Sequence, residues 1–223
     1  MRHHRSARGG GLRAHLGALA SLPALILSLL ASTIGCASRS QINADLASAV
    51  RPVPSGVRLT TAVAEYPVSG ASIADIRREM AREGTRASDG RRWPAVTRWR
   101  IRWTFEYERQ AAACAFRTVR VMVDATVDFS RWDGSAATDT SLVRWWDQFR
   151  DRLLDHEAGH VRIAAEGGRE VYDALRSLQA GTCEQLATRA NFVGREILFR
   201  VRDRQATYDL DTRHGARPGT PTR

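Results

Sequence analysis

The feature that most constrains the fold is a long apolar stripe with helical spacing in the second half of the chain. From Asp139 onward, apolar residues and two histidines recur every three, four or seven positions. The stripe consists of Leu142, Trp145, Trp146, Phe149, Leu153, His156, His160, Ala164, Val171, Leu175 and Leu178. This period predicts an amphipathic helix whose stripe faces a core. Both histidines therefore belong to the buried side.

Residues 156 to 160 spell HEAGH. On a helix, His156 and His160 lie one turn apart on the same face, so both imidazoles can reach one cation. H-E-x-x-H is the pattern of zinc hydrolases, in which the glutamate, here Glu157, is the general base. The alternative is a chance match on an ordinary amphipathic helix. Gly159, inside the motif, would let another element pack closely against it.

A double glycine and a second helical pattern follow. Gly167-Gly168 is expected to bend or end the first helix. A last helix is predicted from about Cys183 to Asp203, because Leu186, Ala190, Val193, Ile197 and Val201 align on one face. The following segment, from Ala206 to the end, is polar and turn-like in composition, and residues 216–223 are expected to be disordered.

The first half of the chain alternates with the period of strands. In TRWRIRWTFEYE the residues Trp99, Ile101, Trp103, Phe105 and Tyr107 point one way. We favour a core face for this aromatic row over a ligand platform. A second strand, RTVRVMVDATVDF, follows a short polar segment, so an antiparallel pair is expected. Residues 57–63 alternate as a further strand, YPVSG at 66–70 indicates a turn, and Ser72 can cap a short helix.

Together these patterns predict the α+β class: a small antiparallel sheet with one helix, followed by a helical half that carries the histidine motif. The predicted domains are a signal segment (1–36), a polar tether (37–56), one folded domain (57–215) and the tail.

The N-terminus has the basic, apolar and small-residue parts of an export signal. Ile34-Gly35-Cys36 resembles the end of a bacterial lipobox, although Thr33 stands where that motif usually has leucine. We therefore expect a lipid on Cys36 and a periplasmic protein held at the membrane. An uncleaved N-terminal anchor and plain secretion are the alternatives.

The basic charge is weak support for a nucleic-acid partner. The formal net charge is +10, and every basic residue is arginine. Four of the 34 arginines and no acidic residue precede residue 37, so the net charge of the rest is +6. The remaining arginines are scattered rather than clustered in a tract, so we expect no nucleic-acid binding.

Export also changes the interpretation of the cysteines. If Cys36 carries lipid, Cys114 and Cys183 remain as a pair in an oxidising compartment, where a disulfide is expected. Two buried free thiols are the alternative. Neither cysteine lies in a C-x-x-C arrangement, which argues against a cysteine-based metal site.

The chain resembles a bacterial family of exported proteins of unknown function that are described as predicted secreted zinc-dependent proteases. The resemblance covers roughly residues 57 to 216. It rests on the YPVSG segment, the TRWRIRW strand, Cys114, the W-x-x-F-x-x-x-L-x-x-HEAGH helix, Cys183, and Y-D-x-x-T-x-H-G at Tyr208 to Gly215. HEAGH is the specific element, and the resemblance implies zinc hydrolase chemistry through it.

A catalytic zinc site needs a third protein ligand. Glu166 stands where metzincins place their third histidine, but the glycine turn of that motif is Ile163 here, so Glu166 would face away on a continuing helix. Glu170 lies beyond the double glycine, and Asp209 and Asp211 are oxygen alternatives. We choose His214, because three of the six histidines lie in the signal segment and His214 is the one left outside the motif. A solvent-exposed loop histidine is the alternative.

These assignments predict an exported zinc-dependent metallopeptidase that acts on proteins or peptides of the cell envelope. Glu157 would take a proton from water and deliver it to the leaving amine. Tyr208 is a candidate hydrogen-bond donor to the oxyanion, with a buried structural role as the alternative. Asp155 or Asp209 could orient a ligand imidazole. Two other functions stay open: a non-catalytic zinc-binding envelope lipoprotein, and a zinc amidase acting on cell-wall peptides.

Overall fold

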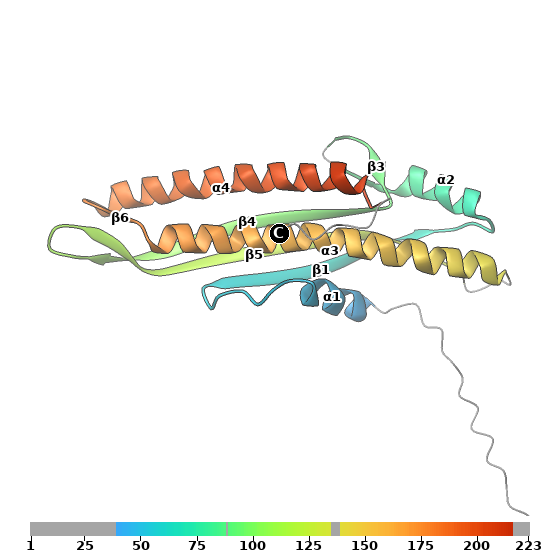
Figure 1. Cartoon of the computed structure of the whole chain (residues 1–223), viewed down its shortest axis with the longest axis horizontal. Helices are drawn as coiled ribbons and strands as arrows, with labels where there is room; N and C mark the ends of the chain where they lie inside the picture. The colour runs from blue at the N-terminus through green and yellow to red at the C-terminus, as the bar shows by residue number, and fades with distance from the viewer. Residues whose placement is uncertain (1–38, 88, 135–138, 216–223) are drawn as a thin grey trace, which may run out of the picture. The chain divides into compact units, whose positions relative to one another are not determined.

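The structure is a computed structural model that describes residues 39–87, 89–134 and 139–215. It confirms the α+β class, with a sheet followed by two long helices (Figure 1). The helices are α1 (Arg39–Ser48), α2 (Ile73–Glu83), α3 (Thr140–Arg176) and α4 (Cys183–Thr212). The strands are β1 (Val57–Val68), β2 (Thr85–Arg86), β3 (Arg92–Trp93), β4 (Ala95–Arg109), β5 (Cys114–Trp132) and β6 (Gln179–Ala180).

Strand β5 is the centre of the main sheet. It pairs with β4 in the predicted antiparallel hairpin and with the short β6 at its beginning. β1, in contrast, runs parallel to β5, from Val57 opposite Val121 to Val68 opposite Trp132. The sheet is therefore mixed and not antiparallel throughout. No tight turn joins β1 to β5, since α2, β2, β3 and β4 lie between them in the chain, so nothing local forces the two strands to be antiparallel.

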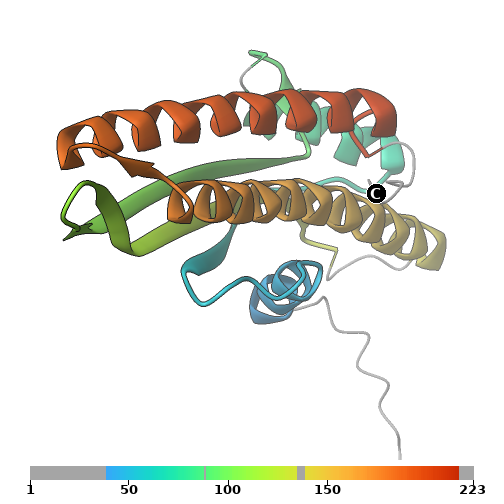
Figure 2. The ribbon, with the colours of Figure 1, turned by 60° about the vertical axis from the view of Figure 1, so that its left-hand side comes forward.

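The two faces of the sheet differ in character. On β5, Val119 to Phe129 at odd positions are buried beneath the helices, and the even positions except Met122 carry polar groups. The polar face has ion pairs across neighbouring strands, such as Arg98 with Asp128 and Arg102 with Asp124. In Figures 1 and 2, α3 and α4 run side by side over the apolar face. The predicted aromatic row of β4 packs largely against this core, and Tyr107 at its far end is exposed.

Helix α3 begins where expected, with Asp139 as its N-cap, but it does not stop at the double glycine. The two glycines serve close packing on opposite neighbours. A Cβ on Gly167 would lie 2.4 Å from Val201 Cγ2 of α4, and a Cβ on Gly168 would lie 2.4 Å from Val123 Cγ2 of β5. The helix does not end at the glycines because the packing across both faces stabilises it through this point.

Helix α4 continues nine residues beyond the predicted end at Asp203. The segment from Ala206 to Thr212, expected to be turn-like, is helical, and Tyr208 and Thr212 within it are buried. Its polar composition is misleading because one face of this last part still packs against α3. The extension matters for function, because it places Asp209 on a helix face.

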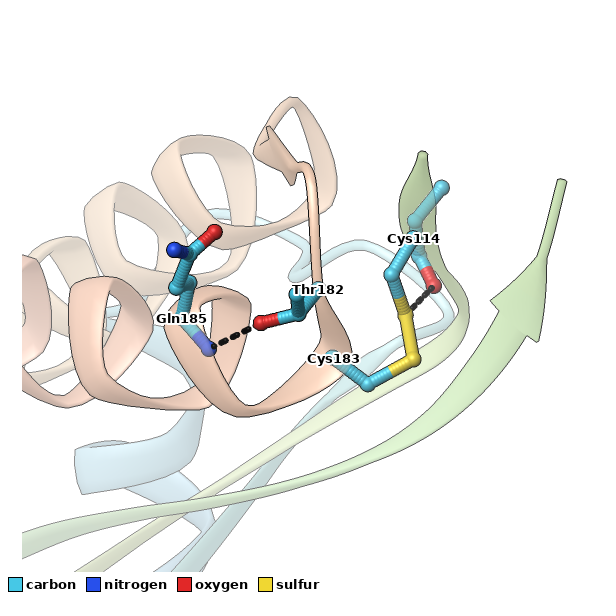
Figure 3. The surroundings of a disulfide bond; sticks show 5 residues. Cys114, Thr182, Cys183 and Gln185 are labelled. Atoms are coloured by element: carbon cyan, nitrogen blue, oxygen red, sulfur yellow. Dashed lines mark hydrogen bonds between the residues drawn. A yellow bond between two sulfur atoms is a disulfide. The ribbon is translucent and has the colours of Figure 1, made fainter. Parts of the chain in front are cut away.

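The disulfide expected from the cysteine count joins Cys114, at the start of β5, to Cys183, at the start of α4 (Figure 3). The Cα atoms are 5.1 Å apart, and 69 positions separate the two residues in the sequence. Thr182 caps the helix next to the bond by accepting a hydrogen bond from the Gln185 N–H. The disulfide thus fixes the beginning of α4 to the sheet.

Two segments near the N-terminal side differ from expectation. Within the proposed tether, α1 forms, and its Ile42 and Leu46 pack into the core beside Val63 and Leu153. Tyr66 and Pro67, expected in a turn, are the last part of β1, because the parallel ladder with β5 continues to Val68. The short helix capped by Ser72 is confirmed as α2.

The proposed signal segment, the lipidation site Cys36 and the tail at 216–223 lie outside the described residues. Among the residues that the structure describes, none of the helices combines the length and apolar character needed to cross a membrane.

Candidate metal centre

Three side chains converge where the middle of α3 meets the end of α4. The Nε2 atoms of His156 and His160 are 3.2 Å apart. Asp209 Oδ1, from α4, lies 3.2 Å from His156 Nε2 and 3.0 Å from His160 Nε2. One ligand atom from each residue falls within 4.8 Å of the other two. Both histidines are buried and Asp209 is half-buried, so the group forms a concave cluster of metal-ligand type.

The outer nitrogens of the histidines are held by α4. Thr212 Oγ1 lies 3.1 Å from His156 Nδ1, and the same hydroxyl donates to the Tyr208 carbonyl at 2.6 Å. It must therefore accept from His156 Nδ1–H. Gln205 donates through Nε2 to the His160 carbonyl at 3.0 Å, which turns its Oε1 toward His160 Nδ1 as an acceptor. Both Nδ1 atoms then carry hydrogen, and both Nε2 atoms present lone pairs to Asp209.

In this arrangement His156 Nε2, His160 Nε2 and Asp209 Oδ1 all present lone pairs to one another, and none of the three atoms carries a proton. Burial alone would raise the pKa of Asp209, but the hydrogen bonds that His156 and His160 donate when Nε2 is protonated hold it well below its usual range. Burial lowers the pKa of His160, but the protonated ring gains a hydrogen bond to Asp209 and the attraction of the Glu157 charge, which together outweigh burial and raise the pKa. The cluster therefore attracts a positive charge, which a proton or a metal cation can supply. Two imidazoles and a carboxylate are a ligand set that suits zinc.

Glu157 lies beside the cluster and is almost completely buried. Its Oε2 accepts a hydrogen bond of 2.5 Å from the Thr97 hydroxyl of β4. Burial raises the pKa of Glu157, while the neighbouring His160 and the Thr97 hydrogen bond act in the opposite direction. A carboxyl group with a raised pKa, next to a cation site, has the properties of a general base.

His214 reaches the same place from the turn that ends α4. Arg213, His214 and Gly215 all have left-handed backbone angles, with φ of 49°, 50° and 78°, so the chain folds back over the end of the helix. His214 donates its backbone N–H to the Asp209 carbonyl at 2.9 Å, and its ring stacks on Trp93 at 3.9 Å. Its Nδ1 lies 3.3 Å from Asp209 Oδ1. The predicted residue thus touches Asp209, but it is not part of the three-residue cluster.

Tyr208 packs behind the motif. Its ring lies parallel to that of His156 and edge-on to that of His160, with centroids 5.1 Å away in both cases. A Cβ on Gly159 would lie 2.1 Å from the Tyr208 hydroxyl oxygen. The close approach expected at Gly159 is therefore made by Tyr208. Tyr208 is not among the residues that line the cleft over the cluster.

A cleft of about 510 Å³ opens over the cluster. Its walls come from α3, from the last turns of α4, from the beginning of β4 and from the region of β3. It is lined by His156, Glu157, His160, Asp209, His214, Gln205, Arg202, Ala206, Leu210, Leu153, Ala87, Asp89, Trp93, Pro94, Ala95, Val96, Thr97 and Trp99. The cation site and the candidate base are thus reached from one side by a groove of useful size.

The other candidates from the sequence lie apart from this cluster. Glu170 forms an ion pair with Arg204 at 2.6 Å, and Glu166 remains on the uninterrupted helix α3 outside the three-residue cluster. Asp155 and Asp211 do not line the cleft. Thr97, Gln205 and Thr212 were not predicted from the sequence as members of the site. Gln205, Asp209 and Thr212 are spaced by four and three residues, a helical signal that appears only if the last helix is extended.

A family model described as "Bacterial protein of unknown function (DUF922)" matches residues 63–215. Since this match spans more than half of the chain, the protein belongs to that family. No curated protein and no solved structure matches the chain. The family supplies no activity, so a function has to be inferred from the site.

Proposed function

We propose that this protein is an exported zinc-dependent metallopeptidase of the cell envelope. The observation that carries the proposal is the convergence of His156 Nε2, His160 Nε2 and Asp209 Oδ1, with both histidine tautomers fixed from behind. Three lone-pair donors 3.0 to 3.2 Å apart repel one another without a cation among them. Asp209 is therefore our third ligand. His214, which the sequence favoured, contacts Asp209 and is not required as a ligand in this proposal.

Zinc held by three protein ligands keeps a position open for water and substrate, acidifies that water and polarises a substrate carbonyl. The chain's own residues supply the proton transfers and the orientation. Glu157 takes a proton from the attacking water on its free carboxylate oxygen, while Thr97 holds the other oxygen in place. Glu157 then returns the proton to the leaving amine nitrogen. Gln205 and Thr212 keep the two imidazoles oriented.

The substrate of such an enzyme would be a protein or peptide of the envelope. We propose a periplasmic location with attachment through a lipid on Cys36 or through the uncleaved N-terminal segment, and no nucleic-acid partner. Support comes from the export-type N-terminus and from the disulfide, which is typical of oxidising compartments.

The test compares metal content with hydrolysis in the purified mature domain. Elemental analysis should find one zinc per chain in the wild type and in Glu157→Gln, whereas casein hydrolysis should be lost in Glu157→Gln. Asp209→Ala should lose zinc, and His214→Ala should retain it. Loss of zinc from His214→Ala with retention in Asp209→Ala would make His214 the third ligand. A wild-type protein without metal after zinc loading would refute the proposal.

The almost complete burial of Glu157 favours one second candidate, a zinc site that serves stability alone. In that case zinc would raise the melting temperature, but neither casein nor purified peptidoglycan would be cut. Cutting of peptidoglycan peptides without proteolysis would instead identify an amidase.

A further inference from the structure

The strand beside the cleft has an unpaired edge. β4 is the last strand of the main sheet, with β5 on its other side. Ser130 N–H donates to the Pro94 carbonyl at 3.1 Å, and the register continues with Ala95 opposite Phe129. Hydrogen-bonded and non-hydrogen-bonded pairs alternate in an antiparallel ladder. The backbone groups of Ala95, Thr97 and Trp99 therefore point away from β5, and no hydrogen bond from the described residues reaches them.

This edge is one wall of the cleft over the cation site, since Ala95, Thr97 and Trp99 all line it. The Thr97 side chain touches Glu157, so the edge runs directly past the candidate base. A polypeptide in extended conformation could add to such an edge through backbone hydrogen bonds, which would hold its carbonyls beside the metal. The edge thus has the geometry for a substrate strand.

The facing wall is α4, where Arg202, Ala206 and Leu210 follow one another at intervals of four residues. α4 runs antiparallel to β4, because Trp103 Nε1 of β4 donates to Asn191 Oδ1 near the beginning of the helix, and His214, just after its end, stacks on Trp93, just before β4. Arg202 therefore lies toward the Trp99 end of the cleft and Leu210 toward the Ala95 end. Arg202 and Asp209 are seven residues apart on the same helix face, or about 10 Å at 1.5 Å per residue.

Arg202 is the arginine among the residues that line the cleft. Arg202 is exposed, lines the cleft, and has no acidic partner among the described residues. The acidic residue Asp89 also lines the cleft, but it is engaged at the β3 side with the Arg91 N–H and the Trp93 indole. An unpaired guanidinium in a binding groove is suited to a carboxylate of the ligand.

We propose that the substrate is an extended polypeptide that pairs with the free edge of β4 and places an acidic side chain against Arg202. At 3.3 Å per residue, about 10 Å corresponds to about three residues between the scissile carbonyl and the acidic residue. This inference rests on the proposed hydrolytic function, and it names the substrate class of that site. Arg202 determines specificity in this scheme and takes no part in the chemistry.

The test uses fluorescence-quenched peptides of ten residues with one cleavable bond. Each peptide carries Glu, Gln or Lys three residues from that bond, in one series on its N-terminal side and in another on its C-terminal side. The wild-type, zinc-loaded protein should cleave one Glu peptide about ten-fold more efficiently than its Gln counterpart, since one charge-assisted contact corresponds to about one decade. Arg202→Glu should reverse the preference toward Lys without loss of zinc. Arg195→Glu, an exposed charge reversal on α4 away from the cleft residues, should leave it unchanged.

Backbone pairing is tested by N-methylation of single peptide bonds in the preferred substrate. Methylation at every second residue should abolish cleavage, and methylation at the residues between should be tolerated. Hydrolysis with equal rates for Glu, Gln and Lys peptides, or without this alternation, would overturn the inference and leave the proposed function standing. If no peptide is hydrolysed, fluorescence anisotropy measures binding of the labelled Glu peptide. Failure to bind would overturn both the proposed function and this inference. Binding that is abolished by Arg202→Glu would support peptide recognition without hydrolysis.

Discussion

The phenolic oxygen of Tyr208 occupies the space that a side chain on Gly159 would need, 2.1 Å from the position of a Cβ. Gly159 lies between the two histidines of the motif, and Tyr208 directly precedes Asp209. The contact therefore sets how closely the part of α4 that carries Asp209, Gln205 and Thr212 approaches α3. The absence of a side chain at Gly159 is a condition for the cation site and not only for packing.

Gly159→Ala should push α4 away from α3 at this point. The expected result is a loss of about 1–3 kcal/mol in the free energy of unfolding, as for other overpacked cores, together with weaker zinc binding. Thermal unfolding with and without zinc would measure both effects. Gly181→Ala is the matched control, since its Cβ would meet only Gln185 Oε1 at an ordinary 3.5 Å. Unchanged zinc affinity in Gly159→Ala would show that the contact does not position Asp209.

The hydroxyl of Thr212 should matter for zinc although it does not reach the cation site. Thr212→Val keeps the shape of the side chain but removes the acceptor for His156 Nδ1–H. Loss of such an outer partner lowers metal affinity by roughly 10–100-fold. Competition with a chelator of known zinc affinity would measure the change. Thr212→Ser, which retains the hydroxyl, should restore most of the affinity, and equal affinities for the Val and Ser variants would contradict the orienting role.

The sequence predicted the parts of the fold that depend on strong periodicity. Alternation over Trp99 to Tyr107 predicted the strand, and helical spacing of apolar residues predicted α3. The disulfide followed from the number of cysteines. The motif at His156 to His160 could be identified from the sequence because the helix itself places residues four positions apart on one face.

The predictions that the structure corrects failed because the sequence pattern does not show tertiary packing. Gly167-Gly168 has a poor helix propensity, yet both glycines allow a close approach to α3, of α4 at Gly167 and of β5 at Gly168. The end of α4 is polar because several of its residues face the cleft instead of a core, so its helical period was concealed. Asp209 was therefore considered only as an alternative ligand. Its distance from the histidines depends on how two helices pack, which the sequence alone does not specify.

The disulfide should contribute stability at a point remote from the cation site. Closing a loop of about 70 residues corresponds to about 4 kcal/mol in the chain-entropy model. The double substitution Cys114→Ser with Cys183→Ser should lower the free energy of unfolding by up to that amount, as measured by urea denaturation. Cys183 begins α4 and Asp209 lies 26 residues later, or about 39 Å along a helix. Zinc content should therefore remain at the wild-type level in the folded fraction, and its loss would show that the disulfide also positions the site.

The alkaline stability of the protein should depend on Tyr66, which supports the beginning of β4. Its hydroxyl donates to the Pro94 carbonyl at 2.9 Å, just before the cleft residues Ala95 to Thr97. Burial raises the pKa of Tyr66 to about 12 from an ordinary value of 10.0. Because the folded state favours the protonated phenol, its contribution to stability is complete below pH 10 and is lost as the pH rises toward 12.

The free energy of unfolding should therefore fall between pH 10 and 12, and Tyr66→Phe should remove this part of the decrease. The variant should be less stable than the wild type at pH 8, because the Pro94 carbonyl loses a donor. Urea denaturation at a series of alkaline pH values would measure both effects. Tyr107→Phe provides the control, since Tyr107 is exposed at the far end of β4. An identical alkaline decrease in the wild type and Tyr66→Phe would show that another group dominates the alkaline transition.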